Sequence, residues 1–539
     1  MVFTTQLKDV AVVLAYAATV AWLVGKLLEY LRHTAKARTL GCKPAPLGLD
    51  SRDPTGLIIT IKSLRAMKRF EHPAWMVKRM DFLGEQLGRP ATTITVSQPF
   101  FKKNIFTTEP ENLKAILATQ SKDFEFGVGR TDNFWPLLGQ GIFACNGERW
   151  MRSRAMLRPQ FMRSLVSRLD LEERHLQHLM QVLDAKTAGD GWTDRVDLKA
   201  LFFRLTLDSA TELLLGESTN SQLATVASQE KELEGRAFAA AFDAAQRTLS
   251  LGARLGHNYR LVHTSAFRRN VQMAHDFVDH FVVKALAKTA DAKDEENVHP
   301  DDEEATTEKR YIFLDELTKE TRDPVELRSH VLNVLLAGRD TTASVLCWFF
   351  YTMAQEDQAD RYQKLRRLII DSFGTYADPQ DITFESLKAC QYLQWCISET
   401  LRLYTPVSVN LRTAVVDTTL PTGGGKDGKS PVYVKKGMDC VFSTHVMHTR
   451  KDLWGEDARE FVPERWEKKR AGWEYLPFLG GPRVCIGQQF ALTEIAYVVV
   501  RIMQRVDVMD GKASGPLKQS LTLTNSPGAG VNVRLHFVE

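Results

Sequence analysis

The sequence predicts a mainly α-helical protein with a small β-rich subdomain, preceded by an N-terminal transmembrane helix. Three observations predict this fold class. They are an uncharged apolar run near the N-terminus, helical periodicity over residues 110–290 and 325–405, and strand-like segments with turn residues within 409–443. No Pro- and Gly-rich linker divides the rest of the chain, so we expect one domain over residues 61–539.

The composition is that of a globular protein. Of the 539 residues, 44% are hydrophobic and 25% are charged, which excludes wholesale disorder, collagen and a coiled-coil rod. The net charge of +4 gives no case for nucleic-acid binding. The 7 cysteines are odd in number and irregularly spaced, without a CxxC pair or a disulfide framework, and no Asn-x-Ser/Thr sequon occurs. Both facts fit a body in a reducing compartment.

The first segment, residues 1–31, is predicted to be a membrane anchor. Val10–Gly25 has no charge, and the apolar run to Leu28 has about 19 residues, close to the ~20 that span a bilayer. Basic residues follow the run, whereas only Lys8 precedes it, so the positive-inside rule leaves the body in the cytosol. A signal peptide and a buried helix are the alternatives. Residues 32–60, which contain two prolines, are expected to form a hinge.

Other segments carry weaker signals. Residues 60–120 mix short apolar runs with turns, and TTITV at 92–96 is typical of a strand. The segment Asp291–Glu304 holds eight acidic residues and one lysine, which indicates a solvated loop. A long apolar helix is expected from about Gln488 to Val506.

The segment Phe478–Gly487, FLGGPRVCIG, carries the sharpest chemical signal. Its glycines and proline make a tight turn, and Cys485 follows directly before the predicted last helix, where unpaired N–H groups favour a thiolate. One thiolate cannot hold structural zinc, but it can be the single protein ligand of an iron already bound by four porphyrin nitrogens. Arg483 is placed to meet an anion such as a heme propionate. The alternative is a buried, inert cysteine.

The pattern FxxGxRxCxG, with Phe478 and Gly487 at its ends, resembles the heme-binding loop of the cytochromes P-450, and further landmarks follow along essentially the whole chain. The resemblance implies the helical cytochrome P-450 fold and heme b, with Cys485 as the axial ligand of the iron. It also implies O₂ activation with electrons from NADPH. Because the chain shows no Rossmann fingerprint, a separate membrane-bound flavoprotein reductase is implied, with the anchor in the endoplasmic reticulum.

A long helix is predicted from Pro324 to about Ala354. Asp323 is its expected cap, Pro324 takes its first position, and Glu326 completes a capping-box pattern. Some 30 residues correspond to roughly 45 Å, so the helix crosses a domain.

The segment Ala337–Thr342, AGRDTT, lies in the middle of this helix. Gly338 suggests a close approach by another group, and Thr341 can bond back to the carbonyl of Ala337. The segment resembles the family's oxygen-binding groove, which implies that Asp340 is the acid and Thr341 the alcohol that deliver protons to bound dioxygen. The alternative is a set of polar residues on an exposed helix face.

Two more motifs are typical of the same family. Glu399 and Arg402 lie at i and i+3, and with Arg465 of PERW they resemble its Glu-Arg-Arg network, which we assign to folding and support of the heme site. Trp150 and Arg154 lie at i and i+4 and resemble the WxxxR helix, in which both side chains reach one propionate. Position alone makes Arg412 a weaker propionate candidate. For each of these basic residues, an ordinary solvated side chain is the alternative.

Basic residues beside these motifs are expected to form the docking face of the acidic reductase. They are Arg149, Arg152, Arg158, Lys468, Lys469 and Arg470.

Residues 423–430, GGGKDGKS, match the phosphate-loop pattern GxxxxGK[ST]. Pro431 and a strand-like VYV follow instead of a helix, so we expect a β-hairpin loop there and no nucleotide site.

Within the family, several stretches look closest to the fungal alkane and fatty-acid hydroxylases, which favours a long aliphatic substrate. The chain departs from them at Thr405, inserted before Pro406, and at Leu479, where Asn is common. A specialised metabolite such as a polyketide is the second hypothesis. A heme isomerase or sensor is the third, and Asp340 and Thr341 argue against it. The stretches with this resemblance are 311–323, 412–425, 448–452 and 487–494.

Overall fold

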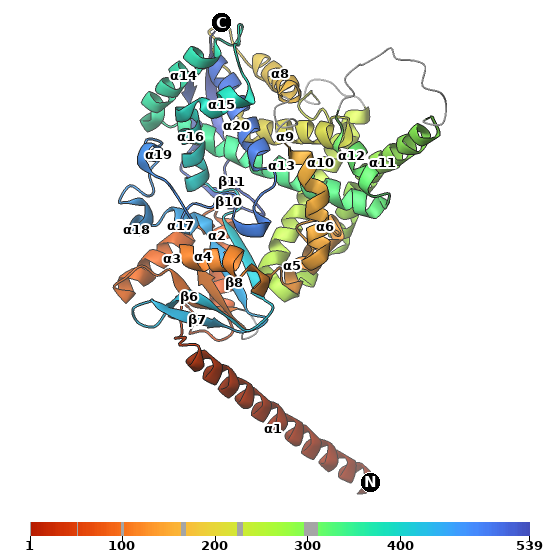
Figure 1. The fold of residues 1–539 in the computed structure, drawn as a ribbon, viewed down its shortest axis with the longest axis vertical. Helices are drawn as coiled ribbons and strands as arrows, with labels where there is room; N and C mark the ends of the chain where they lie inside the picture. The colour runs from red at the N-terminus through yellow and green to blue at the C-terminus, as the bar shows by residue number, and fades with distance from the viewer. Residues whose placement is uncertain are drawn as a thin grey trace.

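The N-terminal helix α1 (Val2–Thr39) projects from the rest of the molecule (Figure 1). The computed structural model describes residues 2–50, 52–98, 102–162, 169–223, 230–295 and 311–538. Within α1, the segment Val13–Thr39 is long and apolar enough to cross a membrane, and its most apolar part is not buried in the protein. The helix is longer than predicted, because it continues to Thr39 through the first part of the segment expected to be a hinge.

The end of α1 contacts the hairpin of β6 (Thr418–Gly424) and β7 (Ser430–Val434). Lys36 Nζ donates to Asp417 Oδ2 at 3.0 Å, and His33 Nδ1 lies 2.9 Å from Tyr433 Oη. The helix α1 is therefore attached to the body by side chains as well as by the backbone.

The hairpin occupies the residues that match the phosphate-loop pattern. Its strands β6 and β7 are antiparallel, and Gly423, Gly425 and Gly428 have φ values of 112°, 79° and 72°. The prediction of a hairpin loop is confirmed.

The central helix α13 (Pro324–Met353) packs against α9 (Leu198–Leu215) and, near its C-terminal end, buries Trp348, Phe349 and Phe350 completely. Full burial of such side chains stabilises the fold by about 1.5–3 kcal/mol each. α13 has the predicted length, and it crosses the interior of the body (Figure 1).

The start of α13 differs from the prediction in one respect. Asp323 caps the helix by accepting from the backbone N–H of Val325 at 2.9 Å, as expected. The capping box is wrong, because the N–H of Asp323 donates to Thr321 Oγ1 at 3.4 Å instead of to Glu326. The Glu326 carboxylate accepts from Thr321 Oγ1 at 2.6 Å and pairs with Arg152 at 3.3 Å.

The remaining α-helices surround α13. Residues 57–87 form two helices, whereas the sequence suggested short apolar runs and turns. The helices were not predicted because both have weak amphipathic patterns. The other helices are α2 (Leu57–Lys68), α3 (His72–Leu87), α4 (Pro110–Lys114), α5 (Val128–Leu138), α6 (Gly147–Leu157), α8 (Asp170–Asp184), α10 (Glu230–Leu255), α11 (Ser265–Glu295), α12 (Phe313–Glu320), α14 (Ala359–Phe373), α15 (Phe384–Ala389), α16 (Gln391–Leu403), α17 (Thr444–His448), α18 (Lys451–Trp454), α19 (Arg465–Lys468) and α20 (Gln488–Arg505).

Two predictions fall on these helices. α20 agrees with the predicted last helix. The acidic segment Asp291–Glu304 differs, because α11 extends to Glu295, and the rest of the predicted loop lies outside the described residues.

The strands form several small, separate sheets among the helices. The largest has the order β1-β2-β8-β5-β3, in which β2 and β8 are parallel and the other neighbours antiparallel. Strand β4 joins a three-stranded sheet with β9 and β12, and β10 pairs with β11; the strands after α20 have no counterpart in the prediction. The strands are β1 (Thr93–Gln98), β2 (Lys102–Thr107), β3 (Phe124–Glu125), β4 (Val196–Asp197), β5 (Val409–Ala414), β8 (Asp439–Ser443), β9 (Val506–Asp510), β10 (Gln519–Leu521), β11 (Asn525–Pro527) and β12 (Asn532–Phe537).

Candidate functional site

A cavity of about 1040 Å³ lies between α13, the loop before α20 and the largest sheet. Of the cysteines in the described chain, Cys485 alone borders it. The structure therefore brings together most of the site residues predicted from separate motifs. Those that border the cavity are Trp150, Arg154, Thr341, Arg412, Phe478, Arg483, Cys485 and Gly487.

The loop that carries Cys485 is held by its own backbone. The N–H of Cys485 donates to the carbonyl of Phe478 at 3.1 Å, and α20 begins directly after its N-cap, Gly487. Gly481 has φ 70°, and a Cβ there would lie 1.8 Å from the carbonyl oxygen of Leu117, so only glycine fits. The tight turn predicted from the sequence is confirmed.

Leu479 gives a physical reason for one departure from the family pattern. Its φ is 59°, in the left-handed region that Asn tolerates better than Leu. Its side chain packs against a buried cluster around Phe442. The chain therefore keeps an apolar contact at the cost of a strained backbone.

The position of Cys485 before a helix predicted that its surroundings favour the thiolate form. The protein atoms around Cys485 do not favour it. Burial raises the pKa of the Cys485 thiol, while the backbone N–H of Gly487 and the charge of Arg154 lower it by less. The side chain is deep in the fold yet exposed to the cavity. The charge of a coordinated metal ion is what deprotonates a ligating thiol in such a place.

Three arginines surround the ring of Phe126 at the edge of the cavity, of which Arg412 is buried and the other two are half-buried. The guanidinium carbons of Arg130, Arg412 and Arg483 lie 4.0, 4.6 and 4.4 Å from the ring centroid. Burial and mutual repulsion lower the pKa of Arg130 to about 10 and also lower the pKa of Arg412. Within the described residues, no carboxylate forms an ion pair with any of the three. This arginine cluster (Arg130, Arg412 and Arg483) fits an anionic ligand such as the propionates of heme.

Trp150 and Arg154 extend the same positive region. Arg483 also lies 4.3 Å from the ring of Trp150, and Arg154 lies 5.8 Å from that ring, so the i,i+4 pair shares one face as predicted. Arg130 was missed in the sequence, because α5 carries no motif around it. Only folding brings it to Asn410, whose Oδ1 accepts from Arg130 at 3.1 Å and from Arg412 at 3.0 Å.

The middle of α13 borders the cavity on another side. Thr341 Oγ1 donates to the carbonyl of Ala337 at 2.6 Å, as predicted. The close approach expected at Gly338 is not made by a described protein atom, because none lies within 4 Å of the place of a Cβ. Gly338 faces the cavity instead, which leaves the groove open.

Asp340 does not border the cavity. Its carboxylate lies 3.5 Å from Arg339, whose guanidinium also pairs with Asp243 on α10. Burial, as the largest cause, raises the pKa of Asp340 to about 6, while Arg339 and Gln246 lower it. The alternative of an exposed helix face is wrong, because Asp340 is 6% exposed.

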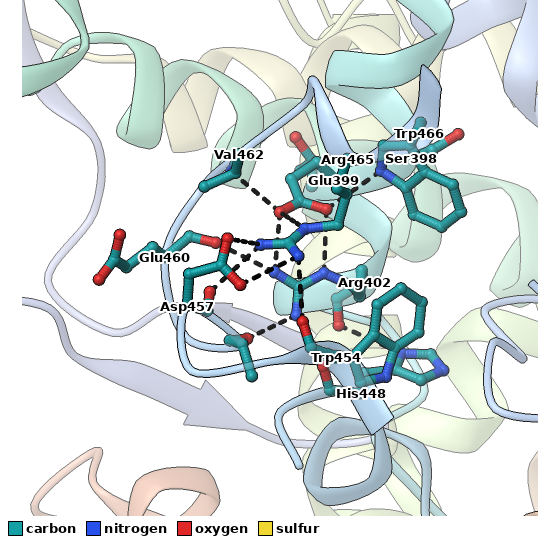
Figure 2. Close-up of polar contacts among 12 residues, drawn as sticks. Ser398, Glu399, Arg402, His448, Trp454, Asp457, Glu460, Val462, Arg465 and Trp466 are labelled. Atoms are coloured by element: carbon teal, nitrogen blue, oxygen red, sulfur yellow. Dashed lines mark hydrogen bonds and ion pairs between the residues drawn. The ribbon is translucent and has the colours of Figure 1, made fainter. Parts of the chain in front are cut away.

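Glu399, Arg402 and Arg465 meet in a buried network away from the cavity (Figure 2). Arg402 binds both oxygens of Glu399 at 2.9 and 2.8 Å, and Arg465 Nε donates to Glu399 Oε1 at 2.9 Å. The remaining Arg402 donors bind the carbonyls of His448, at 2.7 Å, and of Ala458 and Glu460. The predicted network forms, with every charge paired.

The predicted basic face is only partly free. Arg152 pairs with Glu326, and Lys469 Nζ donates to the carbonyl of Leu453 at 3.1 Å. The other four residues are exposed: Arg149, Arg158, Lys468 and Arg470.

Comparisons with known proteins agree with this geometry. The sequence matches the family described as Cytochrome P450 over residues 92–532. The cytochrome P450 monooxygenase g430 of a Fusarium species is 46% identical over 516 residues, covering 95% of this chain and 88% of the relative. Cytochrome P450 52A1 of Candida tropicalis is 43% identical over 445 residues, covering 80% and 78%. The resemblance to fungal members is confirmed.

A solved structure shows the same fold. The crystal structure of the cytochrome P450DA heme domain is 17% identical, with a TM-score of 0.69, covering 92% of this chain and 97% of that one. Family and fold imply heme with a cysteine thiolate ligand. The chain belongs to the cytochrome P450 family of heme-thiolate monooxygenases.

Proposed function

We propose that this monooxygenase inserts one oxygen atom from O₂ into a C–H bond of a long aliphatic substrate, an alkane or a fatty acid. The observation that carries the proposal is a cavity that, among the described residues, is bordered by one thiol and by arginines without carboxylate partners. In this proposal Cys485 ligates the iron. The arginine cluster, Trp150 and Arg154 hold the propionates.

The heme supplies O₂ activation when bound, with electrons from NADPH that arrive through a separate reductase. The chain's own residues handle protons and water. Thr341 offers its hydroxyl at the cavity, and Asp340, whose pKa is raised to about 6, exchanges protons near neutral pH behind it. Glu399, Arg402 and Arg465 support the loop that precedes Cys485.

Arg254, at the end of α10, indicates that the substrate carries a carboxylate. It borders the cavity, and its guanidinium donates to the carbonyls of Ser250 at 2.6 Å and Leu521 at 2.8 Å. Among the described residues, no carboxylate pairs with it. Burial lowers its pKa to about 10, so it stays charged at neutral pH. Most of the wall around it is apolar, which suits an aliphatic chain with one acidic end.

Substrate difference spectra of the ferric protein test this assignment. A long-chain fatty acid and the alkane of the same length are titrated against the protein and against Arg254→Gln. A charged hydrogen bond contributes roughly 1.5–3 kcal/mol, so the Kd of the acid should rise by about tenfold or more and that of the alkane should not change. Arg247→Gln, an exposed position on α10, is the control. Equal losses for both ligands would refute the carboxylate site.

The same titration separates the hypotheses about the substrate. Binding of polyketides in place of both aliphatic ligands would contradict the aliphatic proposal and support a specialised metabolite.

The assignment of Cys485 as the iron ligand has its own test, because Cys485→Ser should abolish the reduced-CO absorption of a thiolate-ligated heme. Retention of that band would remove the basis of an O₂-activating site at Cys485.

We also propose that α1 anchors the protein in the endoplasmic reticulum membrane with the body in the cytosol, where the reductase docks on the exposed arginines and lysines. Reversing Arg158 and Lys468 to Glu should raise the apparent KM for reductase and weaken its salt dependence. Peroxide-supported turnover is the control and should not change. A loss in both assays would mean that the reversal damages the fold and not the docking.

A further inference from the structure

We propose that the short helix α17, which does not border the cavity, determines the position at which the enzyme oxidises an aliphatic chain. It does so by fixing the backbone of residues 405–409, called here the wall segment, which leads from α16 into β5. The effect on oxidation rests on the aliphatic substrate proposed above. The fixing of the wall segment is argued from contacts within the chain.

The wall segment borders the cavity with apolar residues. Pro406, Val407 and Val409 line it, as Thr341 does from α13. An aliphatic chain offers the enzyme a row of nearly equal C–H bonds, so only the shape of the cavity can select among them. The placement of these three residues therefore bears on which carbon is held in the reactive geometry.

Two hydroxyls at the start of α17 hold the second half of the wall segment. Ser443, the N-cap of α17, donates from Oγ to the carbonyl of Ser408 at 2.9 Å. Thr444 Oγ1 donates to the carbonyl of Val407 at 3.2 Å. The same Ser443 oxygen accepts from the backbone N–H of Val446 at 3.2 Å, so one side chain both caps the helix and binds the wall.

Two histidines of α17 hold the start of the wall segment. His445 Nδ1 lies 2.9 Å from the carbonyl oxygen of Leu403, and His448 Nδ1 lies 3.0 Å from Thr405 Oγ1. The carbonyl of Thr405 also accepts from Ser408 Oγ at 2.8 Å. Thr405, where the chain departs from the fungal hydroxylase pattern, therefore contributes a side-chain contact with α17.

Burial makes these contacts decisive for the position of the wall. A buried carbonyl that loses its donor remains unpaired until the backbone moves, because water cannot replace the lost partner. From the other side, the carbonyl of Pro406 accepts from the N–H of Asn525 on β11 at 2.8 Å. The middle of the segment is thus held by β11, and the residues around it are held by α17. The exposed fractions of the α17 side chains are 0% for Ser443, 1% for Thr444, 5% for His445 and 0% for His448.

Hydrogen exchange of the heme-loaded protein without substrate tests the fixing. Thr444→Val removes the hydroxyl with little change in shape, so the amides of residues 405–411 should exchange about fivefold faster or more. Thr444→Ser keeps the hydroxyl and should restore slow exchange. Thr400→Val is the matched control, because Thr400 is also fully buried but donates to the carbonyl of Cys396, at 2.9 Å within α16. Unchanged exchange in Thr444→Val would overturn the proposal.

The positions oxidised in a saturated long-chain fatty acid test the consequence. The ratio of the main product to its positional isomers should fall by about threefold or more in Thr444→Val, because a displacement of about 1 Å can change a rate by up to about 100-fold. Thr444→Ser should restore most of the ratio, and Thr400→Val should not change it. Since the isomers form in one reaction, their ratio does not depend on how much enzyme retains heme.

The two measurements separate this inference from the proposed function. Faster exchange in Thr444→Val with an unchanged isomer ratio would overturn the role of α17 in selectivity and leave the proposed function standing. A wild-type protein that oxidises no aliphatic chain would refute the proposed function, and with it the role in selectivity, whereas the exchange rates would still show whether α17 fixes the wall segment.

Discussion

Two groups of arginines in this protein differ in what neutralises their charges. In the network of Glu399, Arg402 and Arg465, the central carboxylate binds both guanidiniums. In the arginine cluster of Arg130, Arg412 and Arg483, the neighbours are an aromatic ring, an amide and one another. A buried charge with its own partner serves the fold, whereas buried charges without one are stabilised only when an anion arrives. Substitutions should therefore act in opposite directions on the two groups.

Removing the charge at the centre of the network should have the largest effect. Glu399→Gln leaves Arg402, which is fully buried, without a counter-ion. Breaking a buried pair in this way costs about 3–5 kcal/mol of the free energy of unfolding. Urea unfolding of the holoprotein measures it. Asp457→Asn, at the 43% exposed edge of the same network, should cost about 1 kcal/mol at most, and equal losses would contradict the comparison.

The opposite sign is expected in the arginine cluster. Arg130→Met removes one of three repelling cations, so the protein without heme should become more stable, by about 1 kcal/mol or more. Heme affinity should fall by about tenfold or more, because one charged hydrogen bond to a propionate is lost. Thermal unfolding of the heme-free chain and heme transfer to apomyoglobin measure the two effects. A variant less stable without heme would show that Arg130 serves the fold.

His448 connects the paired network to the cysteine loop. Its burial makes the stability of the folded protein sensitive to acid. The N–H of Leu476 donates to His448 Nε2 at 2.9 Å, so that nitrogen carries no proton. Burial, with the charge of Arg402, lowers the pKa of His448 to about 3. Between this value and the ordinary value near 6.5, the unfolded chain binds a proton that the folded chain does not.

Stability should therefore fall as the pH drops below about 6.5, with a slope of up to about 1.4 kcal/mol per pH unit from this group. His448→Gln should flatten the slope of the urea midpoint against pH, although it lowers stability at neutral pH. His280→Gln, at the surface, should leave the slope unchanged. The same slope in all three proteins would contradict the role of His448.

The smallest expected effect concerns the strained residue of the cysteine loop. Leu479→Asn should relieve part of the roughly 1–2 kcal/mol that a left-handed Leu costs, but it loses apolar contact, so a net gain of at most about 1 kcal/mol is expected. Leu479→Ala loses the contact without the relief and should destabilise. An Asn variant less stable than the Ala variant would show that packing outweighs strain at this position.

The sequence predicted the network better than the arginine cluster for a physical reason. Glu399 and Arg402 face each other within one turn of helix, and their pattern is local. Arg130 and Arg412 meet only because α5 and β5 fold against each other, which no local pattern records. The sequence also could not predict that the Asp340 side chain points away from the cavity. Neighbouring side chains on a helix point about 100° apart, and no local pattern selects the one that faces the cavity.

Other differences have the same origin. Asp323 was predicted to bond with Glu326, but Thr321, which is outside the helix, binds both its N–H and the glutamate. The two helices α2 and α3 and the short strands after α20 depend on neighbours rather than on strong periodicity. For motifs with fixed spacing, the local geometry was predicted correctly: the cysteine loop forms its tight turn, and the WxxxR pair shares one helix face.

The attachment of α1 to the β6–β7 hairpin couples the orientation of this helix to that of the body. Residues 29–39 of this continuous helix lie beyond the predicted apolar run and give about 16 Å at 1.5 Å per residue. Because Lys36 and His33 bind Asp417 and Tyr433, a rotation of the helix turns the whole body with it. Tilt in a bilayer follows hydrophobic thickness, so a thinner membrane would present a different face of the body to the lipid. The thickness of the membrane would then influence which side of the enzyme its hydrophobic substrates reach first.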